Sequence, residues 1–331
     1  MVLRVGKGGT AASIGDALKR IGKGGLIEVL PGTYTEEVVL GPDHEGVTLQ
    51  ATEPGKAIVR LPEDSKGTTL VRITQARRVR LKWLTLDGLD KAERAVHVVG
   101  KLDGDAAAWQ PAADIQIIAN RIANLASEAI LLEGPMRKVQ VKENVMWNVP
   151  TGIFHNLARS NSEQTKLVQE ATDELFVVNN SMHVRQIGVR FSGPPLSEKG
   201  GKAKKRVYYQ NNLIVGATRG GFVIEPYRKD LGPSEEYRQA YHVMGNSVWP
   251  ASKTRADILP PAGNASEDPA IGSLDPAQDA LFLRYDESSP IAKRAVKGEK
   301  VEEYARPFIG AFPPYSAEEA RELVKARKPA R

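Results

Sequence analysis

Apolar and polar positions alternate along this chain in short blocks that recur. Blocks beginning at residues 79, 115, 139, 175, 207 and 241 alternate apolar and polar residues, as a β-strand with one buried side does. From the second block onward an Asn stands five residues after the first, with an apolar residue two positions later. These are Asn120, Asn144, Asn180, Asn212 and Asn246, whereas the first block carries Leu84 at this position.

Each block is followed by a second short alternating stretch. These stretches occupy residues 95–99, 129–133, 152–156, 188–192 and 221–225, with a weaker one at 256–259. The blocks are 24 to 36 residues apart, and the difference lies mostly in the loop after the second stretch. A constant body with one variable loop is typical of a solenoid.

The first part of the chain fits the same plan. Residues 10–22 predict a short amphipathic helix that ends at Gly22 and Gly24. We expect strands at 26–30, 37–40, 47–50, 57–61 and 69–73, and a turn at 31–34, where Pro and Gly begin the segment. Because crossover helices are missing between strands, we predict stacked rungs of three short parallel strands, about 4.8 Å apart.

The recurrent Asn then has a mechanical explanation. An Asn at one corner of every rung can bond to backbone groups and to the Asn of the rungs above and below. A single buried amide without partners would be costly, but a series in register satisfies itself. We therefore predict a structural Asn ladder rather than a functional site.

The repeat, the Asn corner, the segment Ile-Glu-Val-Leu-Pro-Gly-Thr-Tyr at 27–34 and Phe-Ile-Gly-Ala-Phe-Pro at 308–313 resemble the right-handed parallel β-helix, or pectate-lyase-like, superfamily of bacterial β-helix repeat proteins. The resemblance implies an all-β, right-handed parallel β-helix of about eight three-strand rungs with a short N-terminal capping helix. It places the coil in residues 1–260 and a tail, packed on the coil in the same domain, in 261–331. A helix at 316–327, with Ser316 as N-cap and Glu319 completing a capping box, is expected in that tail.

The superfamily includes pectate lyases, polygalacturonases, pectin methylesterases, alginate lyases and epimerases, and also non-catalytic adhesins and tailspikes. The resemblance therefore implies a protein that interacts with carbohydrate, with a polysaccharide lyase favoured over a glycoside hydrolase if it is an enzyme. The alternative is a non-catalytic scaffold or adhesion module, cut from a larger protein. The catalytic signatures of polygalacturonases, pectin methylesterases and epimerases do not occur here, so catalysis stays undecided at this point.

Charge and composition indicate which classes of binding partner this protein favours. The net charge is +6 and the pI about 9.3, which favours polyanions such as uronate-containing polysaccharides. Nucleic acid is disfavoured because the basic residues form no stripe interleaved with aromatics. The basic run at 199–206 predicts a solvated loop. The chain has no Cys, which excludes disulfides and thiolate chemistry.

The sequence leaves the compartment and the oligomeric state open. No stretch approaches the roughly 18 apolar residues that a membrane span needs. The first residues contain no apolar leader segment, so an extracellular or periplasmic location requires that a leader was removed.

Alternation along the second stretches predicts which side chains face outward and line a groove. The candidate substrate-binding residues are His97, Glu133, Phe154, Asn156, Ser192 and Glu225, and Arg190 is the candidate base for β-elimination next to a uronate carboxylate. Ca²⁺ is the cofactor that such chemistry brings into consideration, with Glu133, Glu225 and Asp257 as candidate ligands. Glu133 and Glu225 lie three rungs apart, about 14 Å, so they cannot share one ion.

Several other residues are expected to be structural. His155 should point into the core, and His183 and His242 should lie on the surface of other faces. Trp147 and Trp249 should pack against the tail at 261–315. Phe176 and Tyr208 should be outward neighbours that stack on each other.

Overall fold

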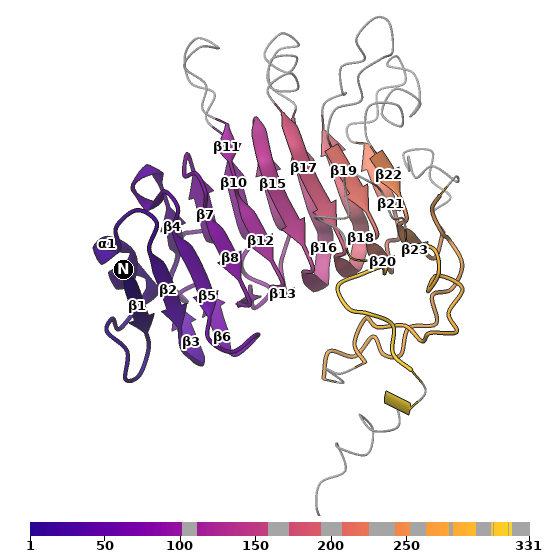
Figure 1. Cartoon of the computed structure of the whole chain (residues 1–331), viewed down its shortest axis with the longest axis horizontal. Helices are drawn as coiled ribbons and strands as arrows, with labels where there is room; N and C mark the ends of the chain where they lie inside the picture. The colour runs from indigo at the N-terminus through magenta and orange to yellow at the C-terminus, as the bar shows by residue number, and fades with distance from the viewer. Residues whose placement is uncertain are drawn as a thin grey trace, which may run out of the picture.

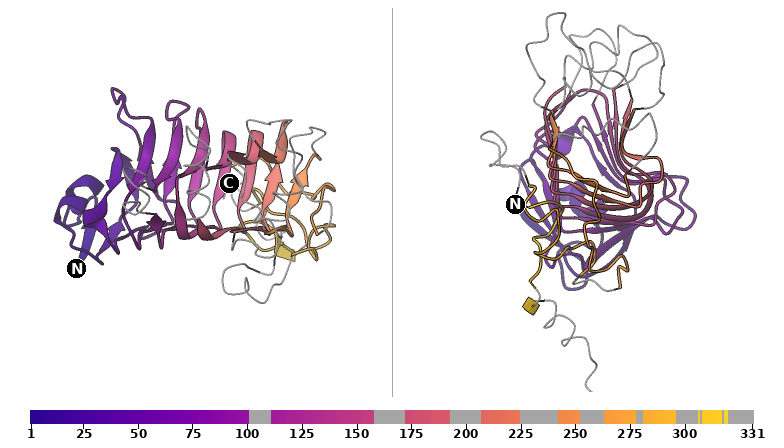
Figure 2. Two further views of the ribbon diagram at one scale, coloured as in Figure 1. Left: turned by 90° about the horizontal axis from the view of Figure 1, so that it is seen from above. Right: turned by 90° about the vertical axis from the view of Figure 1, so that its right-hand side faces the viewer.

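The computed structural model describes residues 1–100, 111–157, 172–192, 207–224, 242–251, 263–277, 281–295, 306, 308–316 and 318–319. Its strands lie side by side along one axis, and each is paired in parallel with the strands of the neighbouring rungs (Figure 1). Seen along this axis, successive rungs superimpose around a common interior (Figure 2, right). The protein is therefore an all-β parallel β-helix, as the repeat predicts.

The coil has three faces, which we call the first, second and third face in chain order. The first face consists of β1 (Val2–Val5), β2 (Leu26–Val29), β5 (Thr48–Ala51), β8 (Arg80–Lys82), β12 (Gln116–Ile118), β15 (Met136–Lys142), β17 (Asp173–Val178), β19 (Val207–Gln210) and β22 (His242–Met244), with β11 (Ala112–Ala113) beside the start of β15. Eight of these strands, β2 to β22, each begin a rung, which confirms the predicted number.

The second face consists of β3 (Gly32–Thr35), β6 (Ala57–Arg60), β9 (Thr85–Asp87), β13 (Arg121–Ala123), the first parts of β16 (Val145–Asn156) and β18 (Ser181–Ser192), β20 (Leu213–Val215) and β23 (Ser247–Trp249). The third face consists of β4 (Val38–Leu40), β7 (Thr69–Thr74), β10 (Arg94–Val99), β14 (Glu128–Glu133), the second parts of β16 and β18, and β21 (Gly220–Ile224). Two faces share β16 and β18 because these strands bend without interruption, with register shifts between Trp147 and Thr151.

The corner between the first and second faces is built in the same way in successive rungs. One residue with a left-handed backbone ends the first-face strand and turns the chain. Its φ lies between 52° and 71° at Trp83, Ala119, Glu143, Asn179, Asn211 and Gly245. The next residue is buried in the coil and directly precedes the second-face strand, and this is the position of the repeated Asn.

The repeated Asn side chains form the predicted ladder, and all five are fully buried. At Asn144, Oδ1 accepts from the backbone N–H and Nδ2 of Asn120 at 3.0 and 3.1 Å. Its own Nδ2 donates to the Ile117 carbonyl at 2.9 Å and to Asn180 Oδ1 at 3.0 Å. The same four bonds recur at Asn180, so each amide is satisfied by the rungs on either side.

The ladder has ends that the repeat did not reveal. Leu84 closes one end, where its backbone N–H donates to Asn120 Oδ1 at 3.1 Å. At the other end Asn264 accepts from the N–H of Asn246 at 2.9 Å, and the next residue, Ala265, pairs with Ser247. A further corner of the coil therefore lies beyond residue 260, within the predicted tail, and the exact domain boundary stays a prediction.

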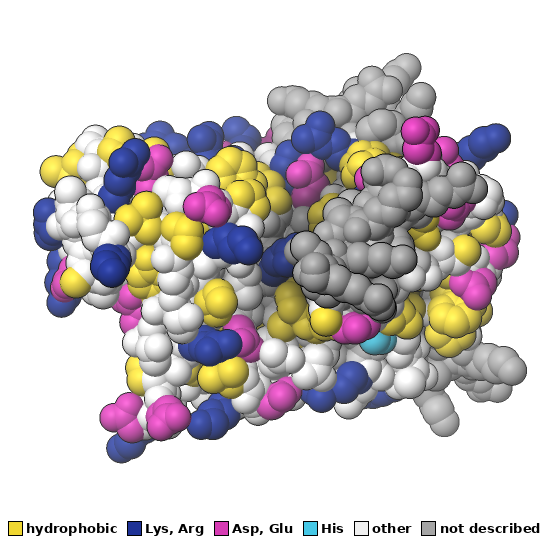
Figure 3. All heavy atoms as spheres, turned by 90° about the horizontal axis from the view of Figure 1, so that it is seen from below, with side chains coloured by type: hydrophobic (Ala, Val, Ile, Leu, Met, Phe, Trp, Pro, Cys, Tyr) yellow, Lys and Arg dark blue, Asp and Glu magenta, His cyan; other side chains and the backbone are white. Residues whose placement is uncertain are grey.

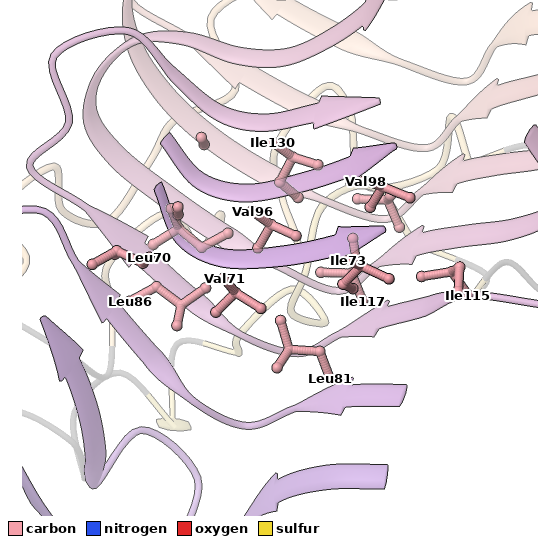
Figure 4. Packing of buried hydrophobic residues seen from close by; sticks show 14 of the residues in the cluster. Leu70, Val71, Ile73, Leu81, Leu86, Val96, Val98, Ile115, Ile117 and Ile130 are labelled. Atoms are coloured by element: carbon pink, nitrogen blue, oxygen red, sulfur yellow. The ribbon is translucent and has the colours of Figure 1, made fainter. Parts of the chain in front are cut away.

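Apolar side chains from all three faces fill the interior in columns along the axis. Val71, Val96 and Ile130 come from consecutive third-face strands and form one such column (Figure 4). Besides the Asn ladder, the polar side chain of His155 lies in the core, as predicted. It is fully buried, its Nδ1 lies 2.8 Å from the Tyr209 hydroxyl, and burial lowers its pKa to about 3.

The N-terminal end of the coil is covered by the predicted helix, α1 (Ile14–Arg20), and a short 3₁₀ turn, η1 (Pro42–His44), follows β4. The Glu36 carboxylate accepts from the backbone N–H groups of Ile14 and Gly15 at 2.8 and 2.7 Å, which holds the helix start on the coil. The turn predicted at 31–34 is wrong. Residues 32–35 form β3 because Tyr34 is buried and its hydroxyl donates to the Leu30 carbonyl at 2.8 Å.

The described part of the tail packs against the second face and lies below its last rungs in Figure 1. Trp147 meets Phe282 edge to face with ring centres 5.5 Å apart, and Trp249 joins the same apolar cluster, so both predictions are confirmed. The N–H of Arg306 donates to Asn179 Oδ1 at 2.7 Å, and that of Gly310 to the Asn211 carbonyl at 2.7 Å.

The predicted C-terminal helix is described only at its start. Residues 318 and 319 are helical, and the N–H of Glu319 donates to the Ser316 hydroxyl at 3.1 Å, as an N-cap requires. The Glu319 carboxylate lies 2.9 Å from Arg284. Within the described residues, no helix is long and apolar enough to cross a membrane.

Candidate functional site

The third face presents its outward side chains in two rows that run along the axis. In one row the strand registers align His97, Leu131, Phe154, Arg190 and Val223. In the other row they align Val99, Glu133, Asn156 and Ser192. The inward neighbours, such as Val96 and Ile153, are fully buried, so the alternation read from the sequence is correct.

Most of the outward side chains on this face are shielded from solvent. Leu131 is 5% exposed and Ser192 is 6% exposed, while Phe154, Asn156 and Arg190 are half-buried. The two rows differ in character. The first row places an apolar pair, Leu131 and Phe154, between His97 and Arg190, and the second row carries a carboxylate, an amide and a hydroxyl on successive strands.

His97 and Glu133 form a close pair at one end of this face. His97 Nε2 lies 2.8 Å from Glu133 Oε2, and the side chains are 12% and 33% exposed. The pair joins β10 to β14 diagonally across neighbouring rungs. The other ring nitrogen, His97 Nδ1, is buried and has no hydrogen-bond partner within the described part of the chain.

Arg190 lies over an aromatic ring at the other end. Its guanidinium carbon is 4.4 Å from the centre of the Phe154 ring, a cation–π arrangement. Its Nη1 is 3.9 Å from Glu128 Oε1, and the other oxygen of Glu128 accepts from Arg94 Nε at 3.0 Å. Glu128 has a side chain only 6% exposed, so a nearly buried carboxylate lies between two arginines.

Glu128 and Arg94 were not among the site residues predicted from the sequence. Both begin third-face strands, where the chain bends away from the second face and the inward–outward alternation is not yet established. A signal was present, because the two residues occupy the same position in consecutive blocks, each directly before Ala and an apolar residue. Opposite charges at equivalent positions of neighbouring rungs are placed side by side by the coil.

Only some of the other predicted site residues lie side by side on the third face. Asn156 and Ser192 are partners in the strand register, whereas Glu133 and Arg190 lie in different rows. Glu225, Asp257, the weak stretch at 256–259 and the basic run at 199–206 lie outside the described residues. Across the described residues, no group of three or more His, Cys, Asp and Glu side chains could hold a metal ion.

Aromatic residues on the first face form a separate column. Phe176 and Tyr208 stack with their ring centres 5.3 Å apart and nearly parallel, as predicted. His242 continues the column at 4.4 Å from the Tyr208 ring, so it is not an isolated surface histidine. His183, on the second face, is half-buried, and desolvation lowers its pKa.

Solved structures of polysaccharide-modifying proteins share likeness with this chain at low identity. The A-module of mannuronan C-5 epimerase AlgE6 from Azotobacter vinelandii is 16% identical, with a TM-score of 0.40, over 63% of this chain and 52% of the module. Pectate lyase Pel9A is 12% identical, with a TM-score of 0.31, over 95% of this chain and 97% of the lyase. Pectin methylesterase PemA from Erwinia chrysanthemi is 11% identical, with a TM-score of 0.24, over 74% and 70%.

The match thus spans about half the length of the epimerase module. No protein-family profile matches the chain. No curated protein matches it either. The assignment of the parallel β-helix follows from the strand registers given above.

Proposed function

We propose that the third face of this protein binds an acidic polysaccharide. The observation that carries the proposal is the side-by-side arrangement of the two outward rows. The half-buried ring of Phe154 suits the C–H face of a sugar ring. In the adjoining row Glu133 and Asn156, half-buried on neighbouring strands about 4.8 Å apart, offer hydrogen-bonding groups that suit the hydroxyl groups of a linear polymer.

Arg190 supports the choice of an acidic polymer. An arginine recognises a carboxylate with two parallel hydrogen bonds, and stacking on Phe154 holds its guanidinium plane in position. Arg190 Nη1 also lies 3.9 Å from the Glu128 carboxylate. His97 and Arg190 lie three strand spacings apart, about 14 Å, so a chain of several sugars would contact both ends of the face.

A lyase activity is the finer form of this proposal. Arg190 in its deprotonated form would take the C5 proton beside the uronate carboxylate, a double bond would form between C4 and C5, and the glycosidic bond at C4 would break, with the leaving oxygen protonated by solvent. Ca²⁺ would serve to neutralise that carboxylate, so the described residues must be tested for a site that holds it. They do not provide one, because Glu133 is engaged by His97 and hard cations require several clustered oxygens. The proposal therefore does not include Ca²⁺, and we favour binding of a carboxylate by Arg190 over catalysis.

Binding is tested by affinity electrophoresis or calorimetry with polygalacturonate and alginate, and with dextran as the neutral comparison. We expect Arg190→Ala to weaken binding to the uronate polymers about tenfold or more, from the loss of one charge-assisted contact. Arg4→Ala is the matched control, since Arg4 is an exposed, ion-paired arginine on the first face. Equal losses in the two variants, or no binding to any uronate polymer at low salt, would contradict the proposal.

Catalysis is tested separately by following the absorbance of unsaturated uronates with the same polymers, with and without added Ca²⁺. Product that disappears in Arg190→Ala supports the lyase. Binding without product supports a non-catalytic module that uses the same face. The two readouts distinguish these outcomes because the first requires only affinity and the second requires bond cleavage.

A further inference from the structure

The first face carries a group of cations that have no ionic partner among the described residues. The strand registers align Arg80, Gln116 and Gln140 in one outward row across β8, β12 and β15. They align Lys82, Ile118 and Lys142 in the neighbouring row. We call the polar members of these rows, Arg80, Lys82, Gln116, Gln140 and Lys142, the basic grid. No acidic side chain belongs to either row on these three strands.

The basic grid lacks ionic and hydrogen-bonding partners in the part of the chain that the structure describes. Arg80, Lys82 and Lys142 form no ion pair within the described residues, and neither Gln side chain forms a hydrogen bond there. The Lys82 ammonium lies over the Trp83 ring at 4.6 Å. Arg80 is exposed and the other four are half-buried, so their polar ends face solvent from a flat sheet.

Nearby charges do not neutralise the grid. Arg137 and Lys138 stand exposed at the beginning of β15 and add to the positive charge. Glu143, next to Lys142, is held by Arg306 at 3.0 Å. Asp114, another acid near the grid, lies two residues before Gln116. On the side of the molecule seen in Figure 3, by contrast, basic and acidic side chains are interspersed.

The spacing of the grid suits a linear ligand. Adjacent strands are about 4.8 Å apart and alternate residues along a strand about 6.6 Å apart, so Lys82 and Lys142 are separated by two strand spacings, about 9.6 Å. A polymer lying along the coil axis would therefore meet a cation followed by two amides in one row, and two cations separated by Ile118 in the neighbouring row. Cations attract the negative groups, and Gln amides can both donate to and accept from hydroxyls.

We propose that the basic grid is a second binding site, for a carboxylated polysaccharide that runs along the axis of the coil. This site is separate from the third face and does not depend on the function proposed for it. A nucleic acid fits less well, because single strands bind through aromatic rings accessible between the cations. The next aromatic side chains along the same row, Phe176 and Tyr208, are each only 7% exposed.

The test is a charge-removing double variant, Arg80→Gln with Lys142→Gln, measured by calorimetry against polygalacturonate at several salt concentrations. We expect affinity to fall about tenfold and its salt dependence to weaken, because two ionic contacts are lost. The matched control is Lys19→Gln with Lys56→Gln, which removes the same charge from exposed lysines outside the first face. The urea midpoints should be nearly unchanged, since the replaced side chains form no ion pair or side-chain hydrogen bond within the described residues.

Further arms distinguish the partners. Dextran sulfate tests whether sulfate replaces carboxylate, dextran tests the neutral backbone, and a DNA strand tests nucleic acid. Equal losses in the double variant and its control would overturn the site in favour of a general charge effect, as would no binding of polygalacturonate by the wild type. DNA binding as tight as polygalacturonate binding, and lost in the double variant, would overturn the choice of partner. A full loss already present in Arg190→Ala would place all binding on the third face and likewise overturn the proposal.

Discussion

Replacing Asn180 by Ala should destabilise the coil more than the same change at the end of the Asn ladder. Asn180 Oδ1 accepts from the N–H and Nδ2 of Asn144 at 3.1 and 3.0 Å, so its loss leaves two buried donors without a partner. At about 1 to 3 kcal/mol for each unsatisfied donor, the cost is about 2 to 6 kcal/mol. Asn120 Oδ1 accepts only from the Leu84 N–H, so Asn120→Ala should cost about 1 to 3 kcal/mol.

The assay is urea unfolding followed by far-UV circular dichroism, with the midpoint and the slope compared for each variant. Gln140→Ala is the control, because its half-buried side chain lies outside the ladder and forms no hydrogen bond within the described residues, so its loss should cost under about 1 kcal/mol. The reasoning is refuted if Asn180→Ala costs no more than Asn120→Ala. In that case the ladder would act as separate contacts, or water would replace the missing amide without penalty.

Two further predictions concern the core. Burial lowers the pKa of His155 to about 3, whereas an unfolded His titrates near 6.5. The free energy of unfolding therefore keeps its full value above pH 6.5. It falls as the pH drops from 6.5 toward 3, because only the unfolded state binds the proton in this range. At pH 4 the free energy of unfolding is lower by about 3 kcal/mol. In His155→Gln the urea midpoints at pH 7 and pH 4 should therefore differ less than in the wild type. An unchanged difference would contradict this assignment of the pH dependence to His155. An added Cβ at Gly188 would lie 2.6 Å from the Ile214 side chain, so Gly188→Ala should cost about 1 to 3 kcal/mol in the same assay. Gly22→Ala, where a Cβ meets nothing within 4 Å, should be nearly neutral, and equal costs at both positions would refute the packing argument.

The register of the coil could be predicted from the sequence because it is a local property repeated many times. Alternation with a period of two separates inward from outward residues, and an identical residue at a fixed offset marks one corner. This placed Asn120 to Asn246 in the ladder and His155 in the core. Asn264 was missed because Pro260, Pro261 and Gly263 interrupt the alternation of apolar and polar residues before it. The strand at 32–35 was missed because Pro and Gly are typical of turns, whereas the burial of Tyr34 decides its conformation.

The candidate site was predicted only in part, for a related reason. Which residues face outward on the third face follows from alternation, and Phe154, Asn156 and Arg190 are where it places them. The contacts of Glu128 with Arg94 and Arg190 join β14 to β10 and β18 near a bend of the chain. They depend on how neighbouring rungs pack, so alternation along one strand does not predict them.

The sequence by itself therefore determined the architecture of this protein: a parallel coil, its register and the side of each strand that is buried. These follow from local alternation and from residues that must repeat to be satisfied. The tail was expected on Trp147 and Trp249, but its contacts with Asn179 and Asn211 became known from the tertiary structure alone. The same holds for the grouping of Arg80, Lys82 and Lys142 on the first face, because these contacts join residues far apart in the chain, which no local pattern encodes.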